Sequence, residues 1–228
     1  MRARSTPSVI GHRGAPGYRP EHTRAAYELA FALGADAVEP DIVATKDGVL
    51  VVRHENEISG TTNVADHPEF ADRRTTKEVD GVALTGWFTE DFTWSELSLL
   101  RARERLPQLR QASATFDDRY PILRLSDVLE VVDSASDAAS RALGLVAELK
   151  HATYFEAAGL PLDELFVDTL ADAGWSDHPG LVVESFEKTV LGRLSASVGG
   201  ACTWWRRRAR RPTGSPRSAP PHLATRPM

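Results

Sequence analysis

The chain has 228 residues, of which 42% are hydrophobic and 26% charged, enough for one domain with its own core. Its one cysteine excludes an internal disulfide and a cysteine-rich metal site. No stretch approaches the roughly 18 apolar residues of a membrane span, and no apolar segment follows the N-terminus as in a signal peptide. We therefore expect a soluble, cytoplasmic protein without stable membrane insertion.

The first part of the chain alternates short apolar runs with one amphipathic segment. The period of the apolar residues distinguishes the two kinds of element, and glycines mark their ends. The predicted elements are a strand at Val9-Ile10 that ends in a tight turn, a helix at 23–33, and strands at 37–43 and 49–53. Strand, helix and strand in succession are typical of a βα architecture.

Residues from about 55 to 118 interrupt this alternation. The segment is polar, rich in Thr and Asp, and it also carries the aromatic residues Trp87, Phe88, Phe92 and Trp94. We expect an insertion after the third strand, partly helical over 94–104. Its aromatic side chains are expected to pack a small core of their own, or else to line a substrate cleft.

The βα alternation resumes after the insertion. The predicted elements are helices at 126–132, 162–173 and from 188, and strands at 143–150 and 181–186. About five strands, all parallel, are thus expected within residues 1–198.

The pattern stops after Ser197, and no strand is predicted in residues 199–228. Seven arginines and no acidic residue lie from Ala201 onward, so the net charge of −5 combines an acidic body with a basic tail. The Arg, Pro, Ser and Ala content predicts a disordered tail. We also hypothesise that this tail is translated out of frame, which the coding DNA would test. The tail contains no element that would read a groove of DNA, so we expect no nucleic-acid partner.

Carboxylates stand near the ends of two predicted strands. Glu39 and Asp41 are two residues apart, so their side chains share one face of a strand and would converge on the mouth of a barrel. Charges so close repel unless a cation lies between them, and all-oxygen ligation favours Mg²⁺ or Ca²⁺. Glu148 can add a third oxygen, and Lys150 can neutralise a phosphate oxygen. Solvated acids and a plain ion pair are the alternative readings.

His12 and His54 each end a predicted strand. One imidazole could take a proton from a nucleophile while the other gives one to a leaving group, each worth about 10²–10⁴-fold in rate. A single histidine is more often structural, but two at matching strand ends beside carboxylates favour catalysis. The planar fork of Arg13 suits phosphate oxygens. Together these residues point to cleavage of a phosphodiester.

The order of these motifs resembles that of the glycerophosphodiester phosphodiesterase family. The matching segments are His12-Arg13-Gly14, Pro20-Glu21-His22-Thr23, Glu39-Pro40-Asp41, His54-Glu55, Glu148-Leu149-Lys150 and Ser185-Phe186. They cover about residues 8–197, and the insertion at 55–118 is similar to that of the longer bacterial members. One departure is Glu184, which stands where the family usually has Gln.

This resemblance implies a TIM-type (β/α) barrel that hydrolyses small-molecule glycerophosphodiesters to glycerol 3-phosphate and an alcohol, with Ca²⁺ or Mg²⁺ as cofactor. Carried over by position, the acid/base pair is His12 and His54. The cation ligands are Glu39, Asp41 and Glu148. Arg13 and Lys150 contact the substrate, supported by Glu21. A TIM barrel has eight strands. We therefore expect an incomplete barrel of about five strands, truncated or frame-shifted at its C-terminal side.

Two other functions stay open at this point. The chain could be a catalytically inactive remnant of such an enzyme. It could also be a related barrel phospholipase, because phosphatidylinositol-cleaving phospholipases and sphingomyelinase D-like enzymes also use a barrel with two histidines. The Glu-x-Asp and Glu-x-Lys segments, together with the insertion, favour the glycerophosphodiesterase.

Overall fold

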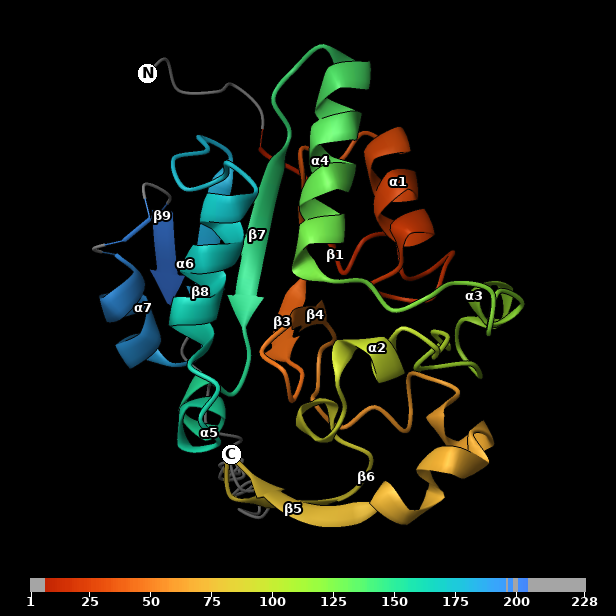
Figure 1. Ribbon diagram of the computed structural model, residues 1–228. Helices are drawn as coiled ribbons and strands as arrows, with labels where there is room; N and C mark the ends of the chain where they lie inside the picture. The colour runs from red at the N-terminus through yellow and green to blue at the C-terminus, as the bar shows by residue number, and fades with distance from the viewer. Residues whose placement is uncertain (1–6, 196, 199–200, 205–228) are drawn as a thin grey trace, which may run out of the picture.

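The computed structural model describes residues 7–195, 197–198 and 201–204, and Figure 1 shows an open sheet with helices layered against one side. The strands of this sheet are β1 (Ile10–His12), β2 (Ala37–Glu39), β3 (Asp41–Ala44), β4 (Leu50–Val52), β7 (Gly144–Leu149), β8 (Leu181–Ser185) and β9 (Ala201–Trp204). Parallel pairing runs in sequence from β1 through β2 and β3 to β7, β8 and β9. This succession is that of a TIM-type barrel that is not closed within the described residues.

Strands β2 and β3 lie end to end on either side of Pro40. Strand β7 pairs with both of them, with Val38 opposite Leu145 and Asp41 opposite Glu148. Proline has no backbone N–H to give to a sheet, but its carbonyl still accepts, here from the N–H of Glu148 at 2.9 Å. The break at Pro40 therefore leaves Glu39 and Asp41 beside Glu148.

The prediction that residues 49–53 form a third parallel strand was wrong. Strand β4 pairs antiparallel with β3, with Ile42 opposite Val52. The turn at 46–48 is too short for a parallel crossover, which needs about a dozen residues. This antiparallel return has a functional consequence, because the backbone N–H of Arg53 donates to the Asp41 carbonyl at 3.0 Å. The chain thus brings His54 back to the level of Asp41.

The prediction that no strand follows Ser197 was also wrong. Strand β9 pairs parallel with β8, from Val182 opposite Ala201 to Ser185 opposite Trp204. Strand β9 has only four residues, which are too few to show the alternation of a strand in the sequence. Its conformation becomes evident only from its pairing with β8. The remainder of the predicted disordered tail, residues 205–228, lies outside the described residues.

Four of the described helices pack side by side over one face of the sheet, in the order in which they occur in the chain. A fifth, shorter helix follows β7. They are α1 (Arg24–Ala32), α4 (Leu125–Ala139), α6 (Leu162–Asp172) and α7 (Lys188–Leu194), with α5 (Ala152–Ala157) between β7 and α6. Helix α1 begins where the Thr23 hydroxyl accepts from the N–H of Ala26. The core between helices and sheet includes the fully buried Tyr27 and Phe166. None of the described helices has the length and apolar character needed to cross a membrane.

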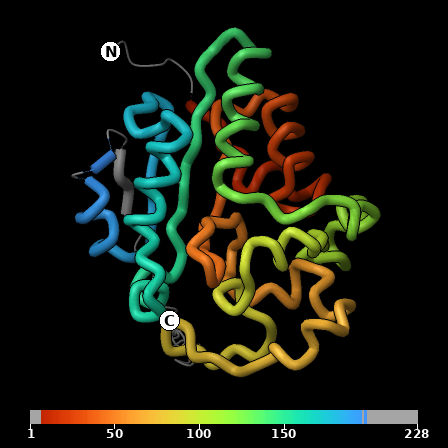
Figure 2. The backbone as a smooth tube through the Cα atoms, in the orientation of Figure 1, coloured from red at the N-terminus to blue at the C-terminus, as the bar shows by residue number. Residues whose placement is uncertain are grey.

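The segment between β4 and α4 lies beyond the C-terminal ends of the strands (Figures 1 and 2). It contains the hairpin β5 (Thr75–Val79) and β6 (Val82–Gly86), helices α2 (Trp94–Leu97) and α3 (Gln111–Ala114), and 3-10 turns at Val64–Asp66, Pro68–Arg73 and Thr89–Asp91. The helix predicted over 94–104 is therefore shorter than expected, because the N–H groups of 101–103 bond outside any helix, Ala102 to the Tyr120 carbonyl.

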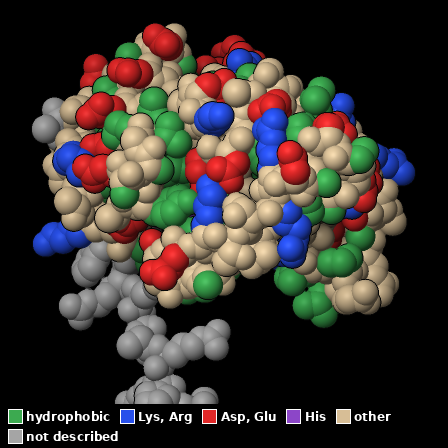
Figure 3. All heavy atoms as spheres, turned by 60° about the horizontal axis from the view of Figure 1, so that its bottom comes forward, with side chains coloured by type: hydrophobic (Ala, Val, Ile, Leu, Met, Phe, Trp, Pro, Cys, Tyr) green, Lys and Arg blue, Asp and Glu red, His purple; other side chains and the backbone are tan. Residues whose placement is uncertain are grey.

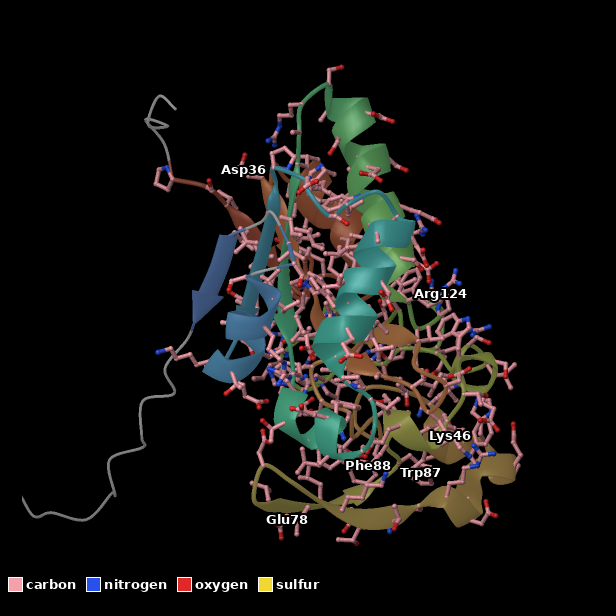
Figure 4. All side chains as sticks on the ribbon, turned by 60° about the vertical axis from the view of Figure 1, so that its left-hand side comes forward. Asp36, Lys46, Glu78, Trp87, Phe88 and Arg124 are labelled. Carbon is pink, nitrogen blue, oxygen red and sulfur yellow. The ribbon has the colours of Figure 1, made fainter. Side chains whose placement is uncertain are left out.

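The aromatic side chains of this segment pack against one another and against the core. Phe88 and Phe92 are fully buried, and Phe70 meets Phe92 edge to face with ring centroids 5.1 Å apart. Figure 4 shows Trp87 and Phe88 on the inner side of the hairpin, whereas Glu78 lies on its outer side. Of the two readings of these aromatics, packing is the one the structure supports.

Candidate active site and metal centre

The chemistry-bearing residues predicted from the sequence lie at the C-terminal ends of adjacent strands. Strand register places His12 opposite Glu39, and Glu148 between Asp41 and Glu184. Figure 3 brings this end of the molecule forward, and acidic and basic side chains lie interleaved near the centre of that face. Parallel strands that end on one level thus collect their polar side chains at one mouth.

His12 lies on the open face of the sheet. Its side chain is 68% exposed, and its Nε2 is 3.8 Å from Glu39 Oε2. The buried part of the ring and the charge of Arg13 lower the pKa of His12 below its ordinary value. The imidazole is therefore neutral at neutral pH and can accept a proton.

The Glu39 carboxylate is buried and incompletely satisfied. Its Oε2 accepts from the backbone N–H of Arg13 at 3.0 Å, while Oε1 has no hydrogen-bond partner among the described residues. Burial and the charges of Asp41 and Glu148 raise the pKa of Glu39 to about 9. Burial likewise raises the pKa of Glu148 to about 7, although Lys150 Nζ donates to it at 2.9 Å. Burial and the neighbouring carboxylates therefore outweigh the single lysine that pairs with Glu148, and in the described part of the chain Glu39 has no lysine or arginine side chain as a partner.

Asp41, in contrast, is surrounded by donors from the protein itself. It accepts from His22 Nε2 at 3.0 Å, and it lies 3.1 Å from Arg13 Nε and 3.4 Å from Lys150 Nζ. These partners outweigh its burial and hold the pKa of Asp41 well below its ordinary value. His22 is fully buried, and its Nδ1 accepts from the Tyr27 hydroxyl at 2.8 Å. His22 is thus a fixed neutral donor, a role the sequence prediction missed although its motif contained the residue.

Glu21 lies beneath the site and is 1% exposed. It pairs with Arg13 at 3.3 Å and with Arg105 Nη2 at 2.6 Å. Despite burial, hydrogen bonding and charge from Arg105 lower the pKa of Glu21 to about 2. The carboxylate therefore supports the Arg13 side chain, in keeping with the supporting role expected for it.

We expect Glu21 to make the stability of the protein fall steeply in acid. A carboxylate whose pKa is depressed on folding stabilises the fold above its unfolded pKa near 4.5, and this contribution is lost as the pH falls towards 2. The shift corresponds to about 3 kcal/mol. Urea unfolding between pH 7 and pH 3 measures this loss, and Glu21→Gln should flatten the profile. An unchanged profile in Glu21→Gln would contradict the assignment.

Arg105 connects Glu21 to the second histidine. Its Nη1 lies 2.6 Å from Glu55 Oε2, and Glu55 Oε1 in turn bonds to His54 Nδ1. The pKa of Glu55 is about 2, because the hydrogen bond and charge of His54, with Arg105, overcome its partial burial. An ionised Glu55 accepts from Nδ1–H and leaves Nε2 of His54 as the reactive nitrogen. No motif marks Arg105, which comes from the polar segment between β4 and α4.

Three carboxylates come together at the ends of β2, β7 and β8. Glu39, Glu148 and Glu184 each offer an oxygen, and these atoms lie within 4.8 Å of one another. Of the predicted cation ligands, the structure joins Glu39 and Glu148 to Glu184, and Asp41 lies beside them. Asp41 Oδ2 faces His22 and Arg13, while Asp41 Oδ1 lies 3.4 Å from Lys150 Nζ and accepts no hydrogen bond among the described residues. The all-oxygen donor set and the unpartnered Glu39 Oε1 fit a hard divalent cation.

A cavity of about 310 Å³ adjoins this cluster. Its lining includes Glu148, Lys150, His151 and Phe186, and the tip of hairpin β5–β6 closes one side, where Asp80 lies 2.7 Å from His151 Nδ1. The volume is in the range of small-molecule sites. Lys150, which is 8% exposed, borders both the carboxylates and the cavity.

Comparisons with known proteins agree with this geometry. The sequence model of the glycerophosphoryl diester phosphodiesterase family matches residues 12–200. The glycerophosphodiester phosphodiesterase GDPD6 of Arabidopsis thaliana is 37% identical over 205 residues, which are 84% of this chain and 53% of that protein. The glycerophosphodiester phosphodiesterase of Treponema pallidum is 28% identical over 83% of this chain and 53% of its own length. The chain therefore spans about half the length of these relatives.

Solved structures show the same fold. A glycerophosphoryl diester phosphodiesterase structure from Silicibacter pomeroyi matches 88% of this chain and 66% of its own, with a TM-score of 0.66 and 24% identity. An Oleispira antarctica phosphodiesterase, solved with the product sn-glycerol-3-phosphate, matches 83% of this chain and 62% of its own, with a TM-score of 0.56 and 25% identity.

Proposed function

Because the chain belongs to the glycerophosphoryl diester phosphodiesterase family, we propose that it hydrolyses glycerophosphodiesters to glycerol 3-phosphate and an alcohol with the help of a divalent cation. The observation that carries this proposal is the convergence of Glu39 and Glu148 beside His12, with Glu39 Oε1 buried and unpartnered. Such a site needs a cation and has a proton acceptor next to it.

The cation is Ca²⁺ or Mg²⁺, held by Glu39, Asp41 and Glu148. Oxygen ligands of this kind select hard cations. When bound, the cation supplies Lewis-acid polarisation of the phosphoryl oxygens. Arg13 and Lys150 lie next to these carboxylates and contact the phosphate of the substrate, while Glu21 fixes Arg13 from below.

His12 and His54 form the acid/base pair. Each lies beside a carboxylate, His12 near Glu39 and His54 on Glu55. One takes a proton from the attacking nucleophile, and the other gives a proton to the leaving alcohol oxygen. A pH–rate profile of single variants distinguishes the two assignments.

We expect the 228-residue chain to release glycerol 3-phosphate from glycerophosphocholine when Ca²⁺ or Mg²⁺ is present. A chelator should abolish the release, and adding back the cation should restore it, because the carboxylate cluster needs a positive charge. A coupled assay for glycerol 3-phosphate measures both. A cooperative thermal melt together with no turnover of any diester would support the inactive remnant instead. Turnover of phosphatidylinositol or sphingomyelin in preference to glycerophosphocholine would support the phospholipase.

A further inference from the structure

Glu184 lies on the same face of the sheet as the proposed cation ligands. In β8 the buried Leu181, Val183 and Ser185 alternate with the half-buried Val182 and Glu184. Glu184 is in register with Glu148 of the parallel neighbour β7. Since side chains directly opposite in register point to the same face, Glu184 and Glu148 both point away from the helix-covered core.

The three carboxylates are closer than uncompensated charges would lie in water. Oxygens of Glu39, Glu148 and Glu184 lie within 4.8 Å of one another. The Glu39 side chain is 4% exposed, and its Oε1 has no hydrogen-bond partner in the part of the chain described. A buried carboxylate oxygen without a donor is costly unless something absent from the polypeptide satisfies it.

The lysine and arginine side chains nearest this cluster pair with residues other than Glu39. Arg13 pairs with Glu21 and Asp41. Lys150 is shared between Asp41 and Glu148. Within the described residues, the one basic side chain within 4 Å of the Glu39 carboxylate is His12, at 3.8 Å, and its imidazole is neutral. Asp41 thus has His22, Arg13 and Lys150 as partners, although its Oδ1 accepts no hydrogen bond among the described residues. Over the same residues, Glu39 has no lysine or arginine side chain of its own, which leaves its side of the cluster for an external positive charge.

We propose that Glu184 is a cation ligand, which supplies a carboxylate oxygen to the divalent cation held by Glu39 and Glu148. This inference deepens the function proposed above and rests on it for the presence of a cation in the site. Glu184 adds a further carboxylate to the ligand set. It raises the negative charge of the ligand set, and ligand charge count is a main determinant of affinity in calcium sites.

Direct cation binding tests the proposal without any assay of activity. Calorimetric titration of the full chain with CaCl₂ and with MgCl₂ should show affinity that falls about tenfold or more in Glu184→Gln and at least as far in Glu184→Ala, because ligand charge sets affinity over orders of magnitude. Glu130→Gln is the matched control, since Glu130 is exposed on α4 and pairs there with Arg24. It should bind as the unaltered chain does.

Thermal melting gives a second readout and shows that the variants fold. Without cation, Glu184→Gln should melt cooperatively near the temperature of the unaltered chain, because the raised pKa values of Glu39 and Glu148 let the crowded carboxyls hold protons instead. With saturating Ca²⁺ the variant should melt at the lower temperature, because it gains less from binding. Equal affinity of Glu184→Gln and the unaltered chain, or no cation binding by the unaltered chain, overturns the proposal. If Glu184 proves necessary for binding but no diester is hydrolysed, the proposed function fails and this inference stands.

Discussion

His12→Ala is expected to lower the hydrolysis of glycerophosphocholine by about 10²–10⁴-fold, the usual worth of a positioned general acid or base. His12 ends β1 at the mouth of the site, 3.8 Å from Glu39, and its lowered pKa leaves it neutral and able to accept a proton. Because its side chain is 68% exposed, its removal costs little packing, so the melting temperature should stay near that of the unaltered chain. Single-turnover kinetics and a thermal melt measure the two effects.

A second histidine provides the control for this experiment. His67 lies between the 3-10 turns Val64–Asp66 and Pro68–Arg73, where it pairs with Glu69 and stacks on Phe70. His67→Ala should keep the rate of the unaltered chain. If His12→Ala keeps the full rate with the cation bound, His12 has no part in proton transfer.

Arg105→Met is expected to lower kcat by about 10–100-fold, comparable to the loss of an outer partner that orients a reactive side chain. Arg105 holds Glu55, and Glu55 holds the Nδ1 of His54, so the substitution leaves the His54 ring without a fixed orientation. It also removes the shortest ion pair of the buried Glu21. Because charge-assisted hydrogen bonds contribute about 1.5–3 kcal/mol each, the free energy of unfolding should fall by about 2 kcal/mol.

Arg103 is a matched control for Arg105, because it comes from the same stretch of chain but pairs with Asp66 and Asp118 at the surface. Arg103→Met should keep kcat. If Arg105 acts by positioning His54, Arg105→Met should shift the pH dependence of kcat while KM changes little. Arg105→Lys should then restore part of the rate. A variant that is destabilised but keeps the kcat profile of the unaltered chain would assign Arg105 to stability alone.

Local patterns predicted the elements that depend on nearby residues. Apolar periods predicted α1, β7 and β8 near their observed bounds, and the first half of α4, whose predicted end at 132 falls short of Ala139. They predicted β4 as a strand parallel to the others, whereas it pairs antiparallel with β3. The turn at 46–48 is too short for a parallel connection and could have shown this. Strand β9 could not be read from its own four residues, because its conformation depends on pairing with β8. Long-range pairing is the information that a local pattern lacks.

The site was predictable in its motifs and not in its contacts. His12, Glu39 and Glu148 could be named because parallel strands end on one level. Arg105 could not be named, since nothing in a polar segment shows which of its arginines folds back 84 residues onto Glu21. Glu184 was visible only as a departure from the usual residue, and its meaning depends on the distance to its neighbours.

The polar segment between β4 and α4 has a consequence for the dynamics of the site. Its Arg105 is bound at once to Glu21, which precedes α1, and to Glu55, which follows β4. Local opening of this segment therefore releases His54 as well, so the population of the competent site is set by the segment's own opening equilibrium. The coupling is reciprocal, so a ligand that binds only the ordered site also stabilises this segment. Such a ligand should therefore slow hydrogen exchange of backbone amides throughout the segment, including amides that it does not contact.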